Sequence, residues 1–233
     1  MMPDDFVDLI KSTGYTRVVI RPTDKPEELT VSAARDLVQK SSVSLRGWDY
    51  PHISHRNDAN GGSETFSTFA QDWCNWQHHR EFWRMYKSGQ FLHYKALRED
   101  LQDDDRKPTG LVFAISSFSY TATEVMEFAY RLFRHGLYQH GADVQLTIGR
   151  SRGRQLWVDD PMRMGFSTPR VTSSETIEVA RTLTRSDFET TTPSAPALSM
   201  ILEVFEAFGW QASPEQISRT QKELYGFGYG RDR

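Results

Sequence analysis

Thiols are almost absent from the chain, which has Cys74 as its single cysteine among 233 residues. One cysteine excludes an intrachain disulfide and is typical of a reducing compartment. Long apolar runs are missing as well, since the longest is about LVFAI, far below the roughly 18 residues that a bilayer-spanning helix needs. The first segment, MMPDDFVDLI, is acidic and has no basic stretch, so it does not read as a signal peptide. These absences predict a cytoplasmic protein without membrane contact.

An excess of charge of one sign is also lacking. The chain carries 28 Lys and Arg against 31 Asp and Glu, a formal net charge of -3. No global field therefore draws it to nucleic acid or anionic lipid, and any such contact must come from a local patch. Hydrophobic residues make up only 38%, but aromatics reach 12%, and large rings remove much apolar area from water.

Nucleophile and nucleotide signatures are missing too. The sequence has no G-x-S-x-G, no S-x-x-K and no Walker motif, and no G-x-G-x-x-G opens a helix. Cys74 lies between tryptophans, where an inert buried thiol is expected. The sequence therefore carries no recognised catalytic motif.

Periodic patterns are present and predict the fold. Residues 73–86 fit either a helix with a tryptophan stripe or an alternating strand, and we favour a strand that enters a hairpin turning at Ser88-Gly89. Thr121 and Glu124 are spaced as the capping box of the best helix. The predicted order is helix 4–12, strand 16–22, helix 30–40, strand 41–45, loop 57–64, the hairpin, strand 110–120, helix 121–136, a second hairpin turning at 151–153, strand 175–189 and two C-terminal helices.

Hairpins dominate this order. We therefore expect an α+β fold, with a mainly antiparallel sheet and helices packed on a face. The predicted organisation is a single domain over 1–225, which includes a C-terminal helical pair at 193–225, followed by a flexible tail at 226–233.

Histidines and carboxylates gather in SLRGWDYPHISHRND, residues 44–58. Asp49 and His52 from this segment, with His79 and Glu81 further along, offer ligands that suit a divalent metal such as zinc, manganese or iron. Their spacing matches no standard signature. The favoured interpretation is a loop anchored by aromatic residues, with no metal or other cofactor.

Two cationic features could bind an anionic group. Arg46 and Trp48 could form an anion-binding corner through guanidinium–indole stacking, or Arg46 could simply lie over an apolar ring. The segment GRSRGR could form a basic β-finger that enters a groove or stacks on a base, or a solvated hairpin tip. The residues of this finger are Arg150, Arg152, Arg154 and Trp157.

The segments LRGWDYPHI, HHREFWRMYKSGQFLHY and QLWVDDP resemble a family of uncharacterised prokaryotic proteins. That family carries an R-G-W-x-Y-P-H segment and a W-R-x-Y-x-S-G-Q-F segment, and the likeness spans about residues 17–225. The resemblance suggests a phage-defence context, implies no activity and assigns no functional residue.

Two hypotheses follow. The first is a non-enzymatic recognition module within a larger prokaryotic assembly, which binds a protein partner or nucleic acid. Its binding residues would be Arg46, Trp48, Arg150, Arg152, Arg154 and Trp157. The alternative is a metal-dependent phosphodiesterase or nuclease in which Arg150 or Arg154 holds phosphate. Its divalent metal would be bound by Asp49, His52, His79 and Glu81.

Overall fold

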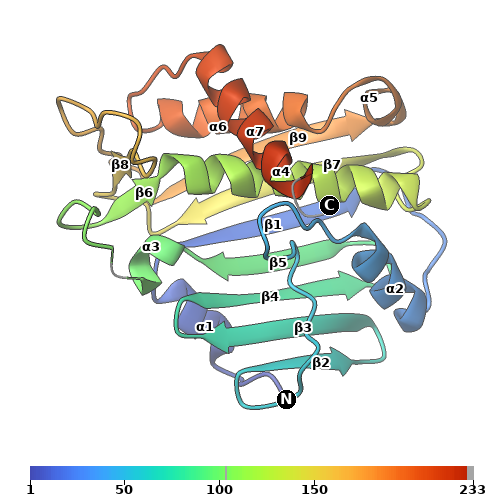
Figure 1. The fold of residues 1–233 in the computed structure, drawn as a ribbon. Helices are drawn as coiled ribbons and strands as arrows, with labels where there is room; N and C mark the ends of the chain where they lie inside the picture. The colour runs from blue at the N-terminus through green and yellow to red at the C-terminus, as the bar shows by residue number, and fades with distance from the viewer. Residues whose placement is uncertain (103, 230–233) are drawn as a thin grey trace.

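The computed structural model describes residues 1–102 and 104–229, with side chains as far as 226. Its centre is one seven-stranded sheet in which every neighbouring pair is antiparallel (Figure 1). The strands lie in the order β2 (Gly61–Thr65), β3 (Phe69–Trp76), β4 (His79–Tyr86), β5 (Phe91–Ala96), β1 (Tyr15–Pro22), β7 (Gly141–Gly149) and β9 (Thr176–Thr184). A separate parallel pair joins β6 (Val112–Ala114) to β8 (Gln155–Trp157). The α+β prediction with a mainly antiparallel sheet is confirmed.

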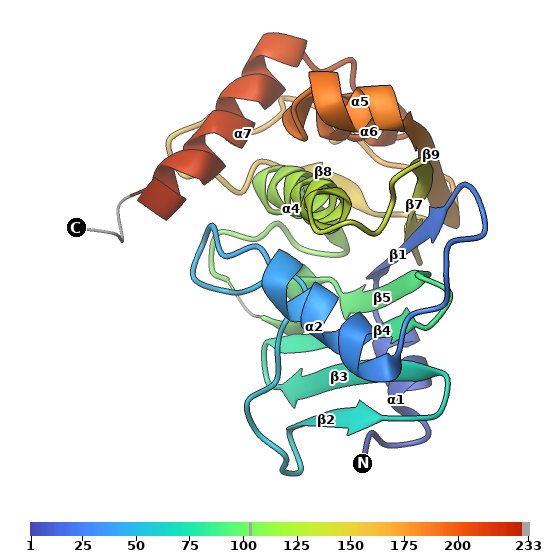
Figure 2. The ribbon, with the colours of Figure 1, turned by 90° about the vertical axis from the view of Figure 1, so that its right-hand side faces the viewer.

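The helices lie on both faces of the sheet, most of them on one (Figure 2). They are α1 (Phe6–Lys11), α2 (Val31–Ser41), α3 (Arg98–Leu101), α4 (Ile115–Arg134), α5 (Arg185–Thr190), α6 (Ser194–Glu206) and α7 (Pro214–Tyr229). Neighbouring side chains of a strand point to opposite faces. Phe82 accordingly packs with α1 in the smaller apolar cluster, whereas Trp83 belongs to the main core with α2, α4 and α6.

The ambiguous stretch 73–86 is strand, as predicted, but it forms parts of two strands. A tight turn at Gln77 and His78 joins β3 to β4, so Trp76 pairs with His79. The next hairpin, β4–β5, turns at Ser88-Gly89 as expected, and Gly89 has the positive φ of 78° that such a turn requires.

Two predictions for residues 41–64 are wrong. Residues 41–45 form no strand, since only an isolated bridge links Val43 to Tyr50. The expected loop at 57–64 contains most of β2. Its glycines are explained by close packing, because a Cβ on Gly62 would lie 2.8 Å from Trp73 Nε1.

Helix α4 begins six residues earlier than predicted, and the expected strand 110–120 shrinks to β6. Thr121 and Glu124 do not form a capping box, because both lie inside the helix. The first turn is capped instead by Asp159, whose carboxylate accepts hydrogen bonds from Ser116 N (2.7 Å) and Ser117 N (3.0 Å). This cap comes from a part of the chain about 40 residues away, so no pattern in the neighbouring sequence predicts it.

The predicted basic hairpin at 149–154 does not form. Strand β7 continues the sheet between β1 and β9, whereas β8 leaves it to pair with β6. The predicted strand 175–189 also ends early, since a capping box between Thr184 and Asp187 starts α5.

The C-terminal helical pair, α6 and α7, is confirmed. Helix α7 runs to Tyr229, so the first four residues of the predicted tail are helical, and 230–233 lie outside the described residues. Within the described part of the chain, no helix is both long and apolar enough to cross a membrane.

Candidate functional site

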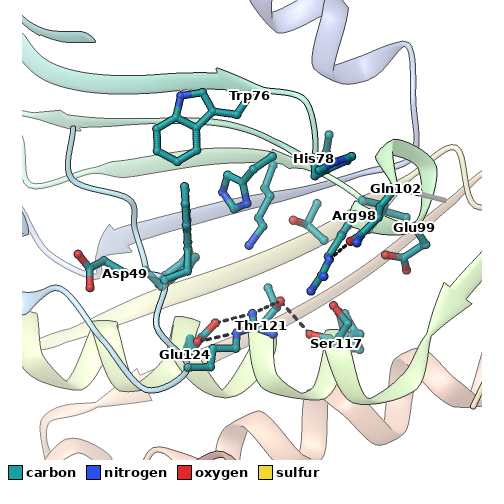
Figure 3. A pocket seen from close by; sticks show the side chains of 18 of the residues that line it. Asp49, Trp76, His78, Arg98, Glu99, Gln102, Ser117, Thr121 and Glu124 are labelled. Atoms are coloured by element: carbon teal, nitrogen blue, oxygen red, sulfur yellow. Dashed lines mark hydrogen bonds and ion pairs between the residues drawn. The ribbon is translucent and has the colours of Figure 1, made fainter. Parts of the chain in front are cut away.

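A cavity of about 450 Å³ lies between the end of the sheet and α4 (Figure 3). One wall is the segment 46–50, and another is the β3–β4 turn with Trp76 and His78. The first turns of α4 contribute Ser117, while α3 closes the far end. The cavity is thus built by segments that are far apart in the sequence.

Glu81 is the buried anion beneath this cavity. Its Oε1 accepts a hydrogen bond from His52 N at 2.9 Å. Its Oε2 lies 3.0 Å from His79 Nε2, 3.4 Å from His93 Nε2 and 3.9 Å from Lys95 Nζ. Burial by itself would raise the pKa of Glu81, but these partners outweigh burial and hold the pKa well below its usual value. Glu81 is therefore ionised at neutral pH.

His52 and His79 are neutral at the same pH. Burial lowers the pKa of both His52 and His79, and the opposing attraction of Glu81 does not reverse the shift. A neutral imidazole keeps one ring nitrogen with a free lone pair, so each ring can accept a hydrogen bond or bind a metal.

Trp48 forms an aromatic wall against these histidines. Its ring stacks on His52 with centroids 4.5 Å apart, lies 4.1 Å from the His79 ring and meets Trp76 edge-on at 4.9 Å. The Trp48 Nε1 and the Tyr50 hydroxyl are buried and have no hydrogen-bond partner among the described residues. A buried polar atom without a partner is rare and calls for an explanation.

Arg46 is held on the opposite wall by α4. Its Nε and Nη2 donate to the two carboxylate oxygens of Glu124 at 3.0 and 2.7 Å, a bidentate ion pair. Its guanidinium lies over Tyr120 at 5.6 Å from the ring centroid. Burial raises the pKa of Glu124, and Arg46 only partly opposes this. Of the two alternatives for Arg46, the structure is nearer the second, since the guanidinium lies over a ring, that of Tyr120, and Glu124 draws it towards the helix.

Arg98 extends from α3 towards the cavity (Figure 3). Its Nε donates to the side-chain oxygen of Gln102, and among the described residues no carboxylate pairs with it. A smaller cavity of about 170 Å³ adjoins this end and is lined by Arg106, Lys107 and Trp157. Because Arg106 is paired with Asp104, the guanidinium that this end of the site offers to a ligand is that of Arg98.

The structure brings together part of the predicted metal set. The side chains of His79 and Glu81 lie side by side. His52 contacts Glu81 only through its backbone N–H, and its ring stacks on Trp48. Asp49 lines the cavity apart from this pair (Figure 3). A different set comes closest to metal-binding geometry: one donor atom each of Cys74, His79 and Glu81 lie within 4.8 Å of one another. Burial raises the pKa of the Cys74 thiol, which is therefore a poor nucleophile in this state.

The three arginines predicted for the basic finger are separated. Arg154 is 1% exposed, pairs with Asp100 and donates to Val112 O at 2.9 Å. Arg152 is exposed and lies 3.6 Å from Glu175. Arg150 donates to Lys11 O at 3.4 Å. They form no common cationic surface.

The sequence does not indicate Cys74, His93, Lys95 or Glu124 as site residues, because Cys74 reads as an inert buried thiol and Glu124 as part of a helix cap. Cys74, Glu81 and Lys95 lie opposite one another on β3, β4 and β5, so strand register alone assembles them. The signal was available in the spacing C-x4-H-x-E across a two-residue turn, but it can be read only after the turn at Gln77 and His78 is known.

Comparison of the chain with protein-family models, curated proteins and solved structures gave no match in any of the three.

Proposed function

We propose that the protein is a non-enzymatic recognition module that binds an acidic segment of a protein partner in the cavity beside α4. The observation that carries this proposal is the concave cavity itself, with an aromatic wall of Trp48, Tyr50 and Trp76 and the Arg98 guanidinium at one end. Tryptophan, tyrosine and arginine dominate the binding energy of protein interfaces. A concave site with a few convergent polar groups is the default place for a ligand.

The donors around the cavity favour a ligand group rich in acceptors. The guanidinium of Arg98 can only donate, and among the described residues only its Nε is bonded, to Gln102, so it offers further N–H groups to a ligand. A carboxylate accepts several such hydrogen bonds at once, and charge-assisted bonds are the stronger kind. An aspartate or glutamate side chain of the partner is the group that meets these donors.

A protein partner is favoured over nucleic acid because the expected basic finger is absent. Arg154 is buried against Asp100, Arg152 is paired with Glu175, and the net charge is -3. Nucleic-acid affinity depends mainly on cations that neutralise phosphates. That the partner belongs to a larger prokaryotic assembly is inferred from the family resemblance alone.

The test is affinity capture from cells of the native host, followed by binding measurements with the captured partner in purified form. Trp48→Ala should weaken binding by about 30-fold or more, the factor that corresponds to a hot spot of about 2 kcal/mol. Arg98→Ala should also weaken it. Arg152→Ala is the matched control, since it removes an exposed arginine outside the cavity.

Circular dichroism establishes that each variant is folded. A partner whose affinity is the same for the wild type and for folded Trp48→Ala and Arg98→Ala would contradict the proposal. Steeply salt-dependent binding to DNA or RNA would instead favour nucleic acid.

A second candidate function, a metal-dependent phosphodiesterase or nuclease, is favoured by the donor cluster of Cys74, His79 and Glu81. Hydrolysis of bis-(p-nitrophenyl) phosphate and of DNA and RNA with added zinc or manganese tests it. Turnover that His79→Ala abolishes in a folded protein would support this function over simple binding.

A further inference from the structure

We propose that Cys74, His79 and Glu81 form a binding site for a divalent transition metal of the zinc class beneath the cavity. Their donor atoms, a thiol sulfur, an imidazole nitrogen and a carboxylate oxygen, all lie within 4.8 Å of one another. The proposal does not depend on which partner or substrate enters the cavity.

The donor chemistry selects the metal. Thiolate and imidazole together favour zinc and its neighbours, whereas magnesium and calcium take oxygen ligands. Zinc–ligand distances of about 2.0–2.3 Å put tetrahedral donor atoms roughly 3.3–3.8 Å apart. His79 Nε2 and Glu81 Oε2 are already 3.0 Å apart. Small side-chain shifts would therefore place the three donor atoms at three corners of a tetrahedron around the metal.

The backbone holds the three ligands in place. Cys74 and Glu81 face each other across β3 and β4, and His79 follows directly after the connecting turn. All three project from one hairpin inside a seven-stranded sheet. Sites on regular elements are positioned more rigidly than sites on loops.

Surrounding groups orient the carboxylate, as outer partners do in metal sites. His52 N donates to Glu81 Oε1, which leaves Oε2 directed towards His79. His93 is fully buried with Nε2 3.4 Å from Glu81 Oε2, and its Nδ1 has no hydrogen-bond partner among the described residues. The imidazole of His93 is therefore a further buried group whose Nε2 is directed at Glu81, one of the three proposed ligands.

The cavity supplies access for the ion. The Cys74 and Glu81 side chains are almost completely buried, but the His79 side chain is 17% exposed and lines the cavity. The fourth coordination position would therefore face the cavity, where water or a ligand atom can occupy it. Binding replaces the thiol proton of Cys74 by the metal.

Lys95 competes with the ion for Glu81. Its ammonium lies 3.9 Å from Oε2, the carboxylate oxygen that faces His79. Replacing this cation by the neutral side chain in Lys95→Met should tighten zinc binding by roughly tenfold. If Cys74, His79 and Glu81 only pack together and bind no metal, Lys95→Met would not tighten zinc binding.

The experiment titrates the chelator-treated full chain with Zn²⁺ by calorimetry and with Co²⁺ by absorbance. We expect one ion per chain and a near-ultraviolet sulfur-to-cobalt charge-transfer band. Loss of an outer partner already costs about 10–100-fold in metal affinity, so Glu81→Gln and His79→Ala should cost at least about 100-fold. Cys74→Ser should abolish the charge-transfer band.

His55→Ala is the control, since His55 is an exposed histidine of the preceding loop. Asp49→Asn tests whether Asp49 is a ligand of the metal in addition to Cys74, His79 and Glu81. It should leave zinc affinity unchanged. Circular dichroism reports whether each variant is folded. Absence of the charge-transfer band in the wild-type chain, which needs no variant to fold, would overturn the proposal, as would a loss of affinity in Asp49→Asn.

Discussion

Arg154 and Arg152 stand two residues apart in GRSRGR and occupy opposite environments. The Arg154 guanidinium is buried, with Asp100 and two backbone carbonyls as acceptors. The side chain of Arg152 is 69% exposed. A Cβ on Gly14 would lie 2.2 Å from Arg154 Nη2, so this glycine leaves the space that the guanidinium fills. The second arginine of the predicted finger is a surface group, and the third is part of the interior.

Alanine substitution should separate these two roles. Arg154→Ala leaves Asp100 without its buried partner and should lower the free energy of unfolding by about 3–5 kcal/mol. Arg152→Ala should change it by about 0.5 kcal/mol or less, because the site is exposed. Urea denaturation monitored by circular dichroism measures both. Equal stability of the two variants would contradict the burial of Arg154.

The same ion pair makes stability depend on pH. Burial by itself would raise the pKa of Asp100, but hydrogen bonds and attraction from Arg154 lower it below the usual value. A carboxyl with a depressed folded-state pKa contributes stability above its unfolded pKa of about 3.9, and loses it as pH falls through the folded value. The stability gap between the wild type and Asp100→Asn should therefore shrink below about pH 4. Urea titrations from pH 7 to pH 3 test this, and a gap that widened with acid would contradict the assignment.

At the candidate site, the sequence indicated residue types but not their arrangement. Residue types alone indicate His52, His79 and Glu81, and the side chains of His79 and Glu81 do meet, whereas His52 contacts Glu81 through its backbone N–H. Cys74 was set aside because its tryptophan neighbours indicated burial, which is correct, but burial did not separate it from the cluster. Which side chains meet depends on strand register, and a shift of one residue would turn Glu81 to the other face of the sheet.

At the scale of elements, α4 shows how a helix start can be set from far away. Its N-cap residue, Ala114, makes no side-chain capping bond, and Asp159 supplies the acceptors instead. The negative charge also lies at the positive end of the helix dipole. This contact joins the β8 segment to the part of α4 that borders the cavity.

Removing the cap should cost a measurable amount. Asp159→Ala should lower the free energy of unfolding by about 0.5–2 kcal/mol, the usual range for a lost helix cap. Asp160→Ala removes the same charge one residue later, from an acid that pairs with Arg163, and should cost less. Thermal unfolding of the two variants compares them. A larger effect from Asp160→Ala would contradict the capping role of Asp159.

Elements with a periodic pattern in their own sequence were predicted well. Elements whose form depends on a partner far away in the sequence were not. Alternation identified β5, and helical spacing over 30–40 identified α2, whose N-cap Thr30 accepts from Ala33 N. The parallel pairing of β6 with β8 joins residues more than 40 positions apart, and the local sequence of β8 favours a hairpin with β7 instead. Local propensity carries no information about such partners.

At the scale of the whole molecule, one apolar core connects most of the elements. It takes Val38 from α2, Phe128 from α4 and Phe205 from α6, together with the inward residues of the sheet. The single-domain organisation remains a prediction, which this shared core supports. We expect a chain with one main core to unfold in one cooperative transition.

Two optical probes test this expectation. Far-ultraviolet circular dichroism and tryptophan fluorescence should give coincident urea transitions. Removing the C-terminal helices by truncation after residue 192 should prevent folding, because it deletes Val204 and Phe205 and exposes the core residues that they cover. Separate transitions, or a folded truncated chain, would contradict a single domain.

The place of β1 in the sheet has a consequence for synthesis on the ribosome. This strand is the first of the seven to be made, yet it lies between β5 and β7. Strands β2 to β5 follow one another as hairpins and can pair as they emerge, whereas β7 starts at Gly141, 119 residues after β1 ends at Pro22. At about 5–20 residues per second, one edge of β1 waits roughly 6–24 s for its partner. During that interval the nascent chain exposes an apolar strand edge that a chaperone would be expected to shield.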